Sequence, residues 1–526
     1  MVIALRPIDA RTRKFEAVQH HYGRPFPRRT LLRGAGGLTV AALFAGTAAT
    51  TACSRTEPAP DDDARFAELD AKVEELMARY AVPGVAVGVW HQGREHLRGF
   101  GVTNLEEPED VTEDTLFRVG STTKTFTGTA LMRLVESGDV HLDERVRTYL
   151  PDFTTSDPEV AERVTVRQLL NHSAGWLGDY YVDFGPGDDA LAKYAAGMAT
   201  LPQLTPLGTT FAYNNAALAL AGHLIEKVTG NTYEQALQEL VLDPLHLDRS
   251  GFFPDELTDV PTTASHNNVE GRAVLNRDAW VMGRSLHPTG GLISTARDQL
   301  RYARFHLGDG GGPDGEQLLT TESLQAMRSH LGPPGTLIVE VDGAGVAWHV
   351  RPTAEGVPVI MHGGSWPGQQ SGFYFVPDRD FALTVLTNSD SGDRLIADIM
   401  YDDWALQRFA GLHNLPADVR DLSPTELAAY EGRYTATEIE ADGAVNSTEA
   451  VLTAEDGRLR YRVLNADGEP KPPEPHAPAY LAFYRDDYVL HLDRDGNSLH
   501  NRANFVRGDD GQVQWLRMGG RLNRRN

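Results

Sequence analysis

Ser121 and Lys124 lie three residues apart in the run 119–125 (V-G-S-T-T-K-T), at the start of an apolar segment with helical periodicity. On a helix, this spacing places both side chains on one face, with about 5–6 Å between their Cβ atoms. A serine hydroxyl becomes a strong nucleophile when a neighbouring base removes its proton. Lysine can be that base if burial and a helix N-terminus bring its pKa well below about 10.4. We therefore predict a nucleophilic Ser121 with Lys124 as its base, against the alternative of a capped helix with a solvated lysine.

Two later segments offer groups that could complete such a site. Tyr213 and Asn215 precede an apolar helical pattern that Gly230 ends. A phenol can relay protons and an amide can bind a substrate carbonyl, although an ordinary turn with an N-capping asparagine is the alternative. The run His362–Ser365 (H-G-G-S) follows a buried strand expected over 359–361. Glycines there let a ligand or another backbone approach closely, and a tight turn beside a core histidine is the alternative.

In this order, S-x-x-K, Y-x-N and H-G-G resemble the three motifs of the serine penicillin-recognising enzymes, with a close match to the class C β-lactamase-like branch. Further segments carry the resemblance over roughly residues 64–412: 116–121 (L-F-R-V-G-S), 165–175 (T-V-R-Q-L-L-N-H-S-A-G) and 288–295 (P-T-G-G-L-I-S-T). The sequence contains no G-x-S-x-G elbow, no H-E-x-x-H motif, no P-loop and no strand-embedded dinucleotide fingerprint. The resemblance implies acyl-enzyme chemistry with neither a metal nor a cofactor.

The resemblance also implies a role for each matched side chain. Ser121 attacks a carbonyl carbon and becomes acylated. Lys124, neutral before the reaction, takes the hydroxyl proton, and Tyr213 shares that proton or relays it to the leaving group. Asn215 is expected to hold a substrate amide or the lysine. These four residues form the expected catalytic and substrate-binding set.

The third motif is expected to supply the oxyanion hole and a catalytic histidine. The backbone N–H groups of Ser121 and Ser365 would bind the developing oxyanion, with Gly364 beside them. His362 replaces the lysine usual in β-lactamases, and an ordinary pKa of about 6.5 predicts that it titrates between about pH 5.5 and 7.5. Gly363 stands where a hydroxyl residue would help to bind a substrate carboxylate. These departures favour peptidase, amidase or esterase chemistry over β-lactam hydrolysis.

The elements that position these residues are expected to form an α/β (α+β) domain of the β-lactamase/transpeptidase type, an antiparallel sheet flanked by helices. A helix is expected over 64–80 and helical segments over 120–310. The family architecture places the S-x-x-K helix beneath the final strands, which brings Ser121 to His362. Asn171 and His172 are expected to be structural. The predicted strands cover 85–90 with a return to 101, 345–350, 359–361, 372–376 and 381–387.

A second domain is expected over residues 422–526. Short alternating segments such as 458–463 and 488–492 are separated by Asp-Gly pairs at 456–457, 495–496 and 510–511, each a strong hairpin signal. The segment 427–434 (L-A-A-Y-E-G-R-Y) resembles the lipocalin-like tail of some penicillin-recognising peptidases. We therefore predict a small all-β barrel that serves as a packing or lid module, with a ligand pocket as the alternative.

The amino-terminal segment, residues 1–53, has the pattern of a twin-arginine export signal with a lipobox. Arg28 and Arg29 precede an apolar run over 38–49, which is too short to span a bilayer. Cys53, the only cysteine of the chain, follows small residues and is expected to be acylated by lipid; the alternative is an unmodified residue lost with the signal. Residues 54–63 are expected to form a polar linker.

The charge balance limits the expected partners. Residues 1–52 hold eight basic and two acidic side chains, so the chain's net charge of −24 leaves −30 on residues 53–526. This acidity argues against nucleic acid and against electrostatic attraction to anionic lipid. We expect an extracytoplasmic protein, tethered through Cys53 to the outer face of a bacterial cytoplasmic membrane or secreted, with a small-molecule or peptide substrate. The sequence gives no indication of oligomeric state.

The combined expectation is an exported serine hydrolase that cleaves amide or ester bonds, in D-residue peptides or small esters. A true β-lactamase is one alternative. A non-catalytic receptor for wall peptides is another, and the intact set of catalytic residues argues against it. A peptide-cyclising thioesterase of the penicillin-binding-protein type combines a similar core with a lipocalin-like tail. It would need a carrier-bound cytoplasmic substrate, so the export signal argues against it.

Overall fold

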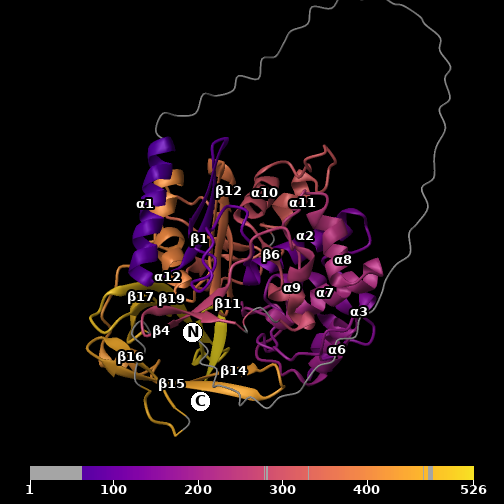
Figure 1. Ribbon diagram of the computed structural model, residues 1–526. Coiled ribbons are helices and arrows are strands. Elements are labelled where there is room, and N and C mark those ends of the chain that lie inside the picture. Colours follow the sequence, from indigo (N-terminus) through magenta and orange to yellow (C-terminus); the bar gives the residue numbers. More distant parts are fainter. Residues whose placement is uncertain (1–61, 278, 280–281, 330, 466, 472–477) are drawn as a thin grey trace, which may run out of the picture. The chain divides into compact units, whose positions relative to one another are not determined.

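The computed structural model describes residues 62–526 apart from 278, 280–281, 330, 466 and 472–477. Its central feature is a seven-stranded sheet with the order β2-β1-β13-β12-β11-β10-β9, in which every neighbouring pair is antiparallel (Figure 1). The strands are β1 (Gly84–His91), β2 (Arg94–Gly101), β9 (Gly343–Ala344), β10 (His349–Arg351), β11 (Val359–Trp366), β12 (Gln369–Val376) and β13 (Phe381–Thr387). The expected antiparallel sheet flanked by helices is confirmed.

The alternating sequence of β1 shows why both faces of this sheet are covered. Val85, Val87 and Val89 belong to the same buried cluster as apolar residues of α1 (Asp62–Tyr80) and α12 (Gly392–Ile396). Ala86, which points to the opposite face, belongs to the cluster formed with the large helical region. Burying each large apolar side chain stabilises the fold by about 1.5–3 kcal/mol.

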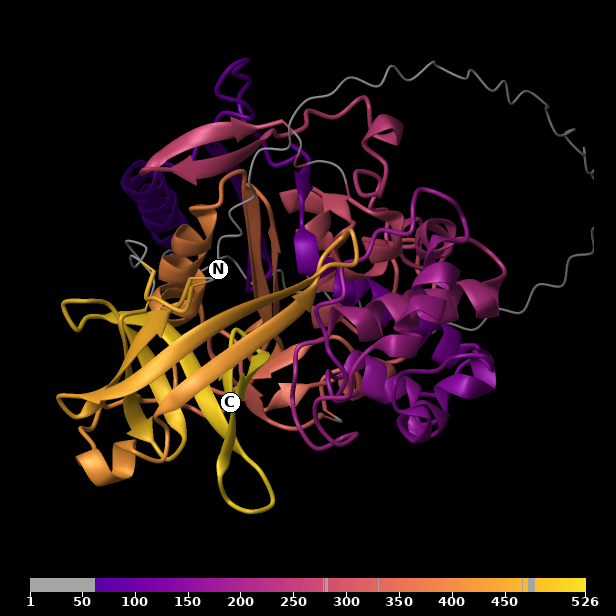
Figure 2. The ribbon, with the colours of Figure 1, turned by 90° about the horizontal axis from the view of Figure 1, so that it is seen from below.

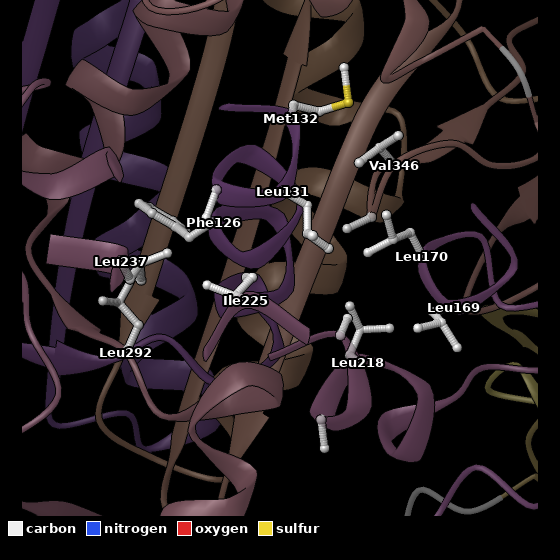
Figure 3. Close-up of a cluster of buried hydrophobic side chains, with 14 of the residues drawn as sticks. Phe126, Leu131, Met132, Leu169, Leu170, Leu218, Ile225, Leu237, Leu292 and Val346 are labelled. Atoms are coloured by element: carbon white, nitrogen blue, oxygen red, sulfur yellow. The ribbon is translucent and has the colours of Figure 1, made fainter. Parts of the chain in front are cut away.

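The helical region encloses the segment that carries Ser121 and Lys124. Helix α2 (Thr123–Glu136) is buried along nearly its whole length and packs through Phe126 and Leu131 into a core that also includes Leu218 and Ile225 of α7 (Asn215–Thr229) (Figure 3). The remaining helices are α3 (Val146–Tyr149), α4 (Pro158–Arg163), α5 (Val166–Leu170), α6 (Ala190–Gly197), α8 (Tyr233–Leu237), α9 (His287–Gly290), α10 (Ala296–Leu307), α11 (Thr321–Ala326) and α13 (Pro424–Leu427).

Short strands pair at the edges of this region. They are β3 (Phe117–Arg118) with β6 (Ile293–Ser294), β4 (Ser265–Val269) with β5 (Arg272–Asn276), and β7 (Gly335–Thr336) with β8 (Glu340–Val341). The β3–β6 pair lies immediately before the nucleophile segment and holds it against the loop that follows α9.

Three boundaries differ from those expected from the sequence. The strand expected over 345–350 is interrupted, because residues 345–348 form a turn in which Ala347 has a left-handed φ of 58°. Strand β11 extends beyond the expected 359–361 through the H-G-G-S run to Trp366, so the alternative of a tight turn at this run is wrong. Helix α1 already begins at Asp62, within the expected linker, because buried Asp62 accepts hydrogen bonds from Arg65 at 2.9 Å and pairs with His91 at 3.0 Å.

The carboxyl-terminal segment forms a closed eight-stranded antiparallel barrel, as expected (Figure 2). Asp456 and Gly457 both have positive φ, as a tight hairpin turn requires. Aromatic side chains that include Tyr430, Phe483 and Phe505 fill the interior of the barrel, and its role as a packing or lid module stays a prediction. The strands are β14 (Gly432–Ile439), β15 (Val445–Glu455), β16 (Arg458–Val463), β17 (Tyr480–Arg485), β18 (Tyr488–Leu492), β19 (Ser498–Arg507), β20 (Val513–Met518) and β21 (Arg521–Arg525).

The expected signal, Cys53 and the linker up to residue 61 lie outside the described residues. Within the described part of the chain, no helix is both long enough and apolar enough to cross a bilayer.

Candidate active site

Ser121 and Lys124 face each other at the start of α2. Ser121 lies in the tight turn Gly120–Thr122 that leads into the helix, and Lys124 Nζ is 3.0 Å from Ser121 Oγ. Lys124 is fully buried, and its Nζ donates a second hydrogen bond to the backbone carbonyl of Thr289 at 2.6 Å. The expected pairing of nucleophile and base is therefore present in the fold.

The surroundings of Lys124 favour its neutral form. Burial lowers the pKa of its ammonium well below the ordinary value, and the positive charge of Arg521 lowers it further, while Asp179 raises it in part. A neutral amine has a lone pair that can take the proton of Ser121. Helix α2 is enclosed by the core and so supplies the burial that this base requires. The apolar residues around the S-x-x-K motif favour that enclosed position.

Tyr213 covers the lysine from the other side. Its ring centroid is 5.0 Å from Lys124 Nζ. Burial raises the pKa of Tyr213 to about 12, although interaction with the Ser121 side chain lowers it somewhat. The phenol therefore keeps its proton at neutral pH and can donate a hydrogen bond or relay a proton between Ser121 and a leaving group.

Two backbone segments meet where an oxyanion would develop. Gly120 has a left-handed φ of 51°, and a Cβ atom at this residue would lie 2.7 Å from the backbone nitrogen of Ser365. A Cβ at Gly364 would lie 2.7 Å from the backbone nitrogen of Ser121 and 1.9 Å from the carbonyl oxygen of Val119. Only glycines allow this approach, which brings the two N–H groups expected to form the oxyanion hole to one place.

His362 lies on β11 and is buried beside the lysine. Burial lowers the pKa of its imidazole well below the ordinary value, and His349 and Lys124 lower it further. This direction argues against the titration expected between about pH 5.5 and 7.5 and favours the neutral imidazole. Its Nδ1–H donates a hydrogen bond to the carbonyl of Gly363 at 2.7 Å.

The glycine at 363 has a steric explanation. A Cβ at this residue would lie 2.6 Å from the hydroxyl of Tyr401 and 3.1 Å from the carbonyl oxygen of Ser371. A threonine or serine would therefore displace Tyr401.

Asn215 does not contact Lys124 through a direct hydrogen bond within the described residues. Its amide nitrogen donates to Asp179 Oδ1 at 2.8 Å and to the hydroxyl of Tyr181 at 3.2 Å. This leaves its amide oxygen as the group for a substrate N–H donor. The helix N-cap is the neighbouring Asn214, whose side chain accepts from Ala217 N–H at 2.8 Å.

The barrel contributes directly to this site, which the sequence did not indicate. The carbonyl of Gly520, in the turn between β20 and β21, accepts a hydrogen bond from the backbone N–H of Tyr213 at 2.9 Å. Arg521 pairs with buried Asp179, with 2.9 Å between Nε and Oδ2, and its guanidinium carbon is 4.8 Å from the centroid of the Tyr213 ring.

The barrel also pairs its β14–β15 hairpin with the same loop of the hydrolase domain. The N–H of Tyr181 donates to the carbonyl of Ile439 at 2.7 Å, and the N–H of Ile439 donates to the carbonyl of Asp179 at 2.9 Å. The loop that carries Asp179 and Tyr181 is therefore held between two parts of the barrel.

Asn171 and His172 lie behind the site, in the loop after α5. Asn171 accepts a hydrogen bond from the hydroxyl of Ser173 at 2.6 Å. His172 is fully buried, and its ring lies 4.6 Å from that of Tyr213. Their expected structural role stays a prediction, and His172 has a further neighbour, His349, that the sequence did not single out.

Comparison with known proteins agrees with this geometry. A family model described as Beta-lactamase matches residues 69–404, so the chain belongs to the Beta-lactamase family. A curated relative, Penicillin-binding protein 4 of Amycolatopsis lactamdurans, is 33% identical over 380 residues, which are 71% of this chain and 98% of that protein. Unguisins hydrolase of Aspergillus violaceofuscus is 24% identical over 465 residues, with 76% of this chain and 79% of that protein covered.

A solved structure, that of SurE, matches the barrel as well as the hydrolase domain. Its TM-score is 0.66 at 26% identity, and the match covers 88% of this chain and all of that chain. SurE has also been solved with D-Leu, and that structure matches with a TM-score of 0.65. Fold, site and relatives together define a serine hydrolase of the Beta-lactamase family with a carboxyl-terminal barrel.

Proposed function

We propose that this protein hydrolyses amide or ester bonds of D-residue peptides or small acyl esters through an acyl-enzyme on Ser121. The observation that carries the proposal is the 3.0 Å approach of Ser121 Oγ to the fully buried amine of Lys124, whose pKa is lowered well below its ordinary value. A base of this kind near neutral pH serves acyl transfer.

The reaction follows from the positions of these groups. As Ser121 Oγ bonds to the substrate carbonyl carbon, its proton passes to Lys124 and the carbonyl oxygen becomes an oxyanion held by backbone N–H groups. The intermediate collapses when the leaving nitrogen or oxygen receives a proton, with Tyr213 as relay. Water then attacks the acyl-enzyme with the same base, which releases the acid and restores the serine hydroxyl.

The third motif supports the choice of substrate class. A neutral His362 and a glycine at 363 offer neither the cation nor the hydroxyl that would bind a carboxylate. Two relatives support the choice of D-residue peptides over other amides as substrates. One is named a penicillin-binding protein, and the other has been solved with D-Leu. A hydrolase among the relatives supports transfer of the acyl group to water.

A substrate panel tests the proposal. Wild type and Ser121→Ala are compared on p-nitrophenyl esters, D-residue peptides and nitrocefin, and mass spectrometry locates a fluorophosphonate adduct. We expect kcat/KM to be highest for an ester or D-peptide, with the adduct on Ser121 and on neither Ser173 nor Ser365. A kcat/KM for nitrocefin above that of every ester and peptide would make the enzyme a β-lactamase. Release of a cyclic peptide in place of an acid would favour the cyclising alternative.

We also propose that the enzyme is exported and held at the outer face of the cytoplasmic membrane by lipid on Cys53. The twin arginines at 28 and 29, the apolar run over 38–49 and the single cysteine support this location. Cell fractionation should find wild type in the membrane fraction and Cys53→Ala in the soluble fraction. Equal membrane association of both proteins would contradict acylation at this residue.

A further inference from the structure

Three buried histidines form a cluster behind Lys124. His172 comes from the loop after α5, His349 from the start of β10 and His362 from β11, and none is more than 2% exposed. The ring centroids of His172 and His349 are 5.3 Å apart, and those of His349 and His362 are 4.5 Å apart. One ring nitrogen from each lies within 4.8 Å of the others. A backbone hydrogen bond of 3.1 Å from Ala347 N–H to the carbonyl of Leu170 joins two of the three segments.

The backbone determines which nitrogen carries the proton in the two outer rings. The N–H of Asn214 donates to Nδ1 of His172 at 3.1 Å, so Nδ1 is an acceptor and the neutral ring carries its proton on Nε2. In His362, Nδ1 is 2.7 Å from the carbonyl oxygen of Gly363, which can only accept. The proton of His362 is therefore on Nδ1, and its Nε2 has a lone pair.

These assignments leave a complementary set of unused groups. Within the described residues, Nε2 of His172, Nε2 of His362 and both nitrogens of His349 are buried without a hydrogen-bond partner. The first is a donor, the second is an acceptor, and the neutral ring of His349 has one of each. Buried polar groups are usually paired with protein or ordered water.

The proton positions favour a water molecule over a metal ion at this cluster. One nitrogen of each ring belongs to a set of three atoms no more than 4.8 Å apart, and such a set has a common point within about 2.8 Å of each, which is a normal hydrogen-bond length. A metal ion would need a lone pair on Nε2 of His172, which carries the proton as long as Asn214 N–H faces Nδ1.

We propose that the three histidines hold one buried water in a directional relay, and that His349 is a positioning residue acting through His362. The water accepts from Nε2–H of His172 and donates to Nε2 of His362, with His349 as its third partner. This arrangement holds His362 as the neutral Nδ1–H tautomer. Only the predicted effect of His349 on catalysis rests on the proposed function.

The three histidines must stay neutral if Lys124 is to take a proton easily. Two other charged groups act on these rings, Lys124 and Arg521, and both are cationic when protonated. The titratable phenol of Tyr213 packs against His172. Burial lowers the pKa of His349 to about 3, and the charge of Lys124 contributes. A protonated imidazole here would oppose the ammonium that forms on Lys124 when it takes the proton of Ser121.

Histidine NMR tests the relay independently of any substrate. In the full chain labelled with ¹⁵N-histidine, long-range ¹H–¹⁵N spectra should show His172 as the Nε2–H tautomer and His362 as the Nδ1–H tautomer. Both should remain neutral from pH 8 to about pH 5. An Nε2–H tautomer of His362, or protonation of any of the three near pH 6, would overturn the proposal. Stoichiometric Zn²⁺ retained after dialysis by wild type but not by His349→Phe would also overturn it.

Two substitutions separate positioning from packing. His349→Gln keeps both a donor group and an acceptor group, whereas His349→Phe keeps a ring and removes both. We expect His349→Phe to slow the labelling of Ser121 by a fluorophosphonate roughly tenfold and to mix the tautomers of His362. His349→Gln should restore the labelling rate to within about threefold. Equal loss in both variants with the His362 tautomer unchanged would make His349 a packing residue. If the tautomers are as stated but no ester or peptide is cleaved, the proposed function fails and the relay stands.

Discussion

Lys124 must take a proton from Ser121 in an interior that contains several other basic groups. Its pKa is lowered first by burial and then by Arg521, and the three neighbouring imidazoles are themselves neutral. The site can therefore accept one proton at the amine closest to the nucleophile. At the residue scale, the chemistry depends on the 3.0 Å contact and on the exclusion of water from the lysine.

The nucleophile and its base should behave as one unit. Ser121→Ala and Lys124→Ala should each reduce kcat/KM for an activated ester by roughly 10³-fold or more, because each removes half of the same proton transfer. The double variant should be little worse than either single variant. Steady-state kinetics on the three proteins measures this. Multiplicative losses would show that the two side chains act independently.

At the scale of elements, the active site depends on contacts between segments that are distant in the sequence. Strand β11 passes so close to the turn before α2 that glycine is required at 120 and 364. The β20–β21 turn of the barrel holds the backbone of Tyr213, and Arg521 pairs with the Asp179 carboxylate to which Asn215 donates. The barrel therefore supports the catalytic loop in addition to packing against the hydrolase domain.

Removing the arginine of this turn should change the pH response as well as the rate. Arg521 lowers the pKa of Lys124, so Arg521→Ala should raise that pKa and shift the acid limb of kcat/KM to higher pH. The Arg521 side chain is 41% exposed, so the stability loss should be about 1–3 kcal/mol, less than for a fully buried pair. Arg524→Ala, an exposed arginine of the same strand, is the matched control. An acid limb at the wild-type position in Arg521→Ala would exclude this electrostatic role.

We expect the Tyr401 hydroxyl to limit the size of the side chain that residue 363 can carry. Gly363→Thr should reduce the free energy of unfolding by about 1–3 kcal/mol, because its Cβ would meet the Tyr401 hydroxyl at 2.6 Å. Tyr401→Phe removes that hydroxyl and should recover part of the loss in the double variant. Urea unfolding of the two single variants and the double variant forms a cycle that measures the coupling. Strict additivity would show that Tyr401 is not the obstacle.

At the scale of the whole molecule, buried neutral histidines make stability depend on pH. Burial lowers the pKa to about 3 in His306 of α10 and in His349, and to about 4 in His491 of the barrel. The unfolded chain binds protons at these residues below about pH 6.5, whereas the folded chain does not until pH 3–4. Stability is therefore expected to fall as pH falls through this range.

Thermal unfolding between pH 7 and 4 measures this dependence. Each such histidine contributes up to about 1.4 kcal/mol of stability loss per pH unit below about 6.5. His491→Leu removes one of these protons and should flatten the slope by that amount, because His491 lies in the barrel away from the catalytic residues. An unchanged slope in this variant would contradict the assignment for His491.

The sequence alone determined the local chemistry and the periodic elements. The spacing of Ser121 and Lys124 identified a helix face. Gly230 marked the end of α7, where it has a left-handed φ of 76°, and Asp-Gly pairs marked hairpins of the barrel. These features depend on neighbouring residues, whose backbone preferences and side-chain periods can be read along the chain.

Only the tertiary structure decided how distant groups change that chemistry. Arg521 lies nearly 400 residues after Lys124, and His349 lies in a segment expected to be a continuous strand, so no local pattern could assign either to the site. The pKa of His362 is lowered from the isolated imidazole value by burial among several elements, which the sequence pattern did not reveal. Proximity, desolvation and charge pairing act through space, and the order of residues along the chain determines them only through the completed fold.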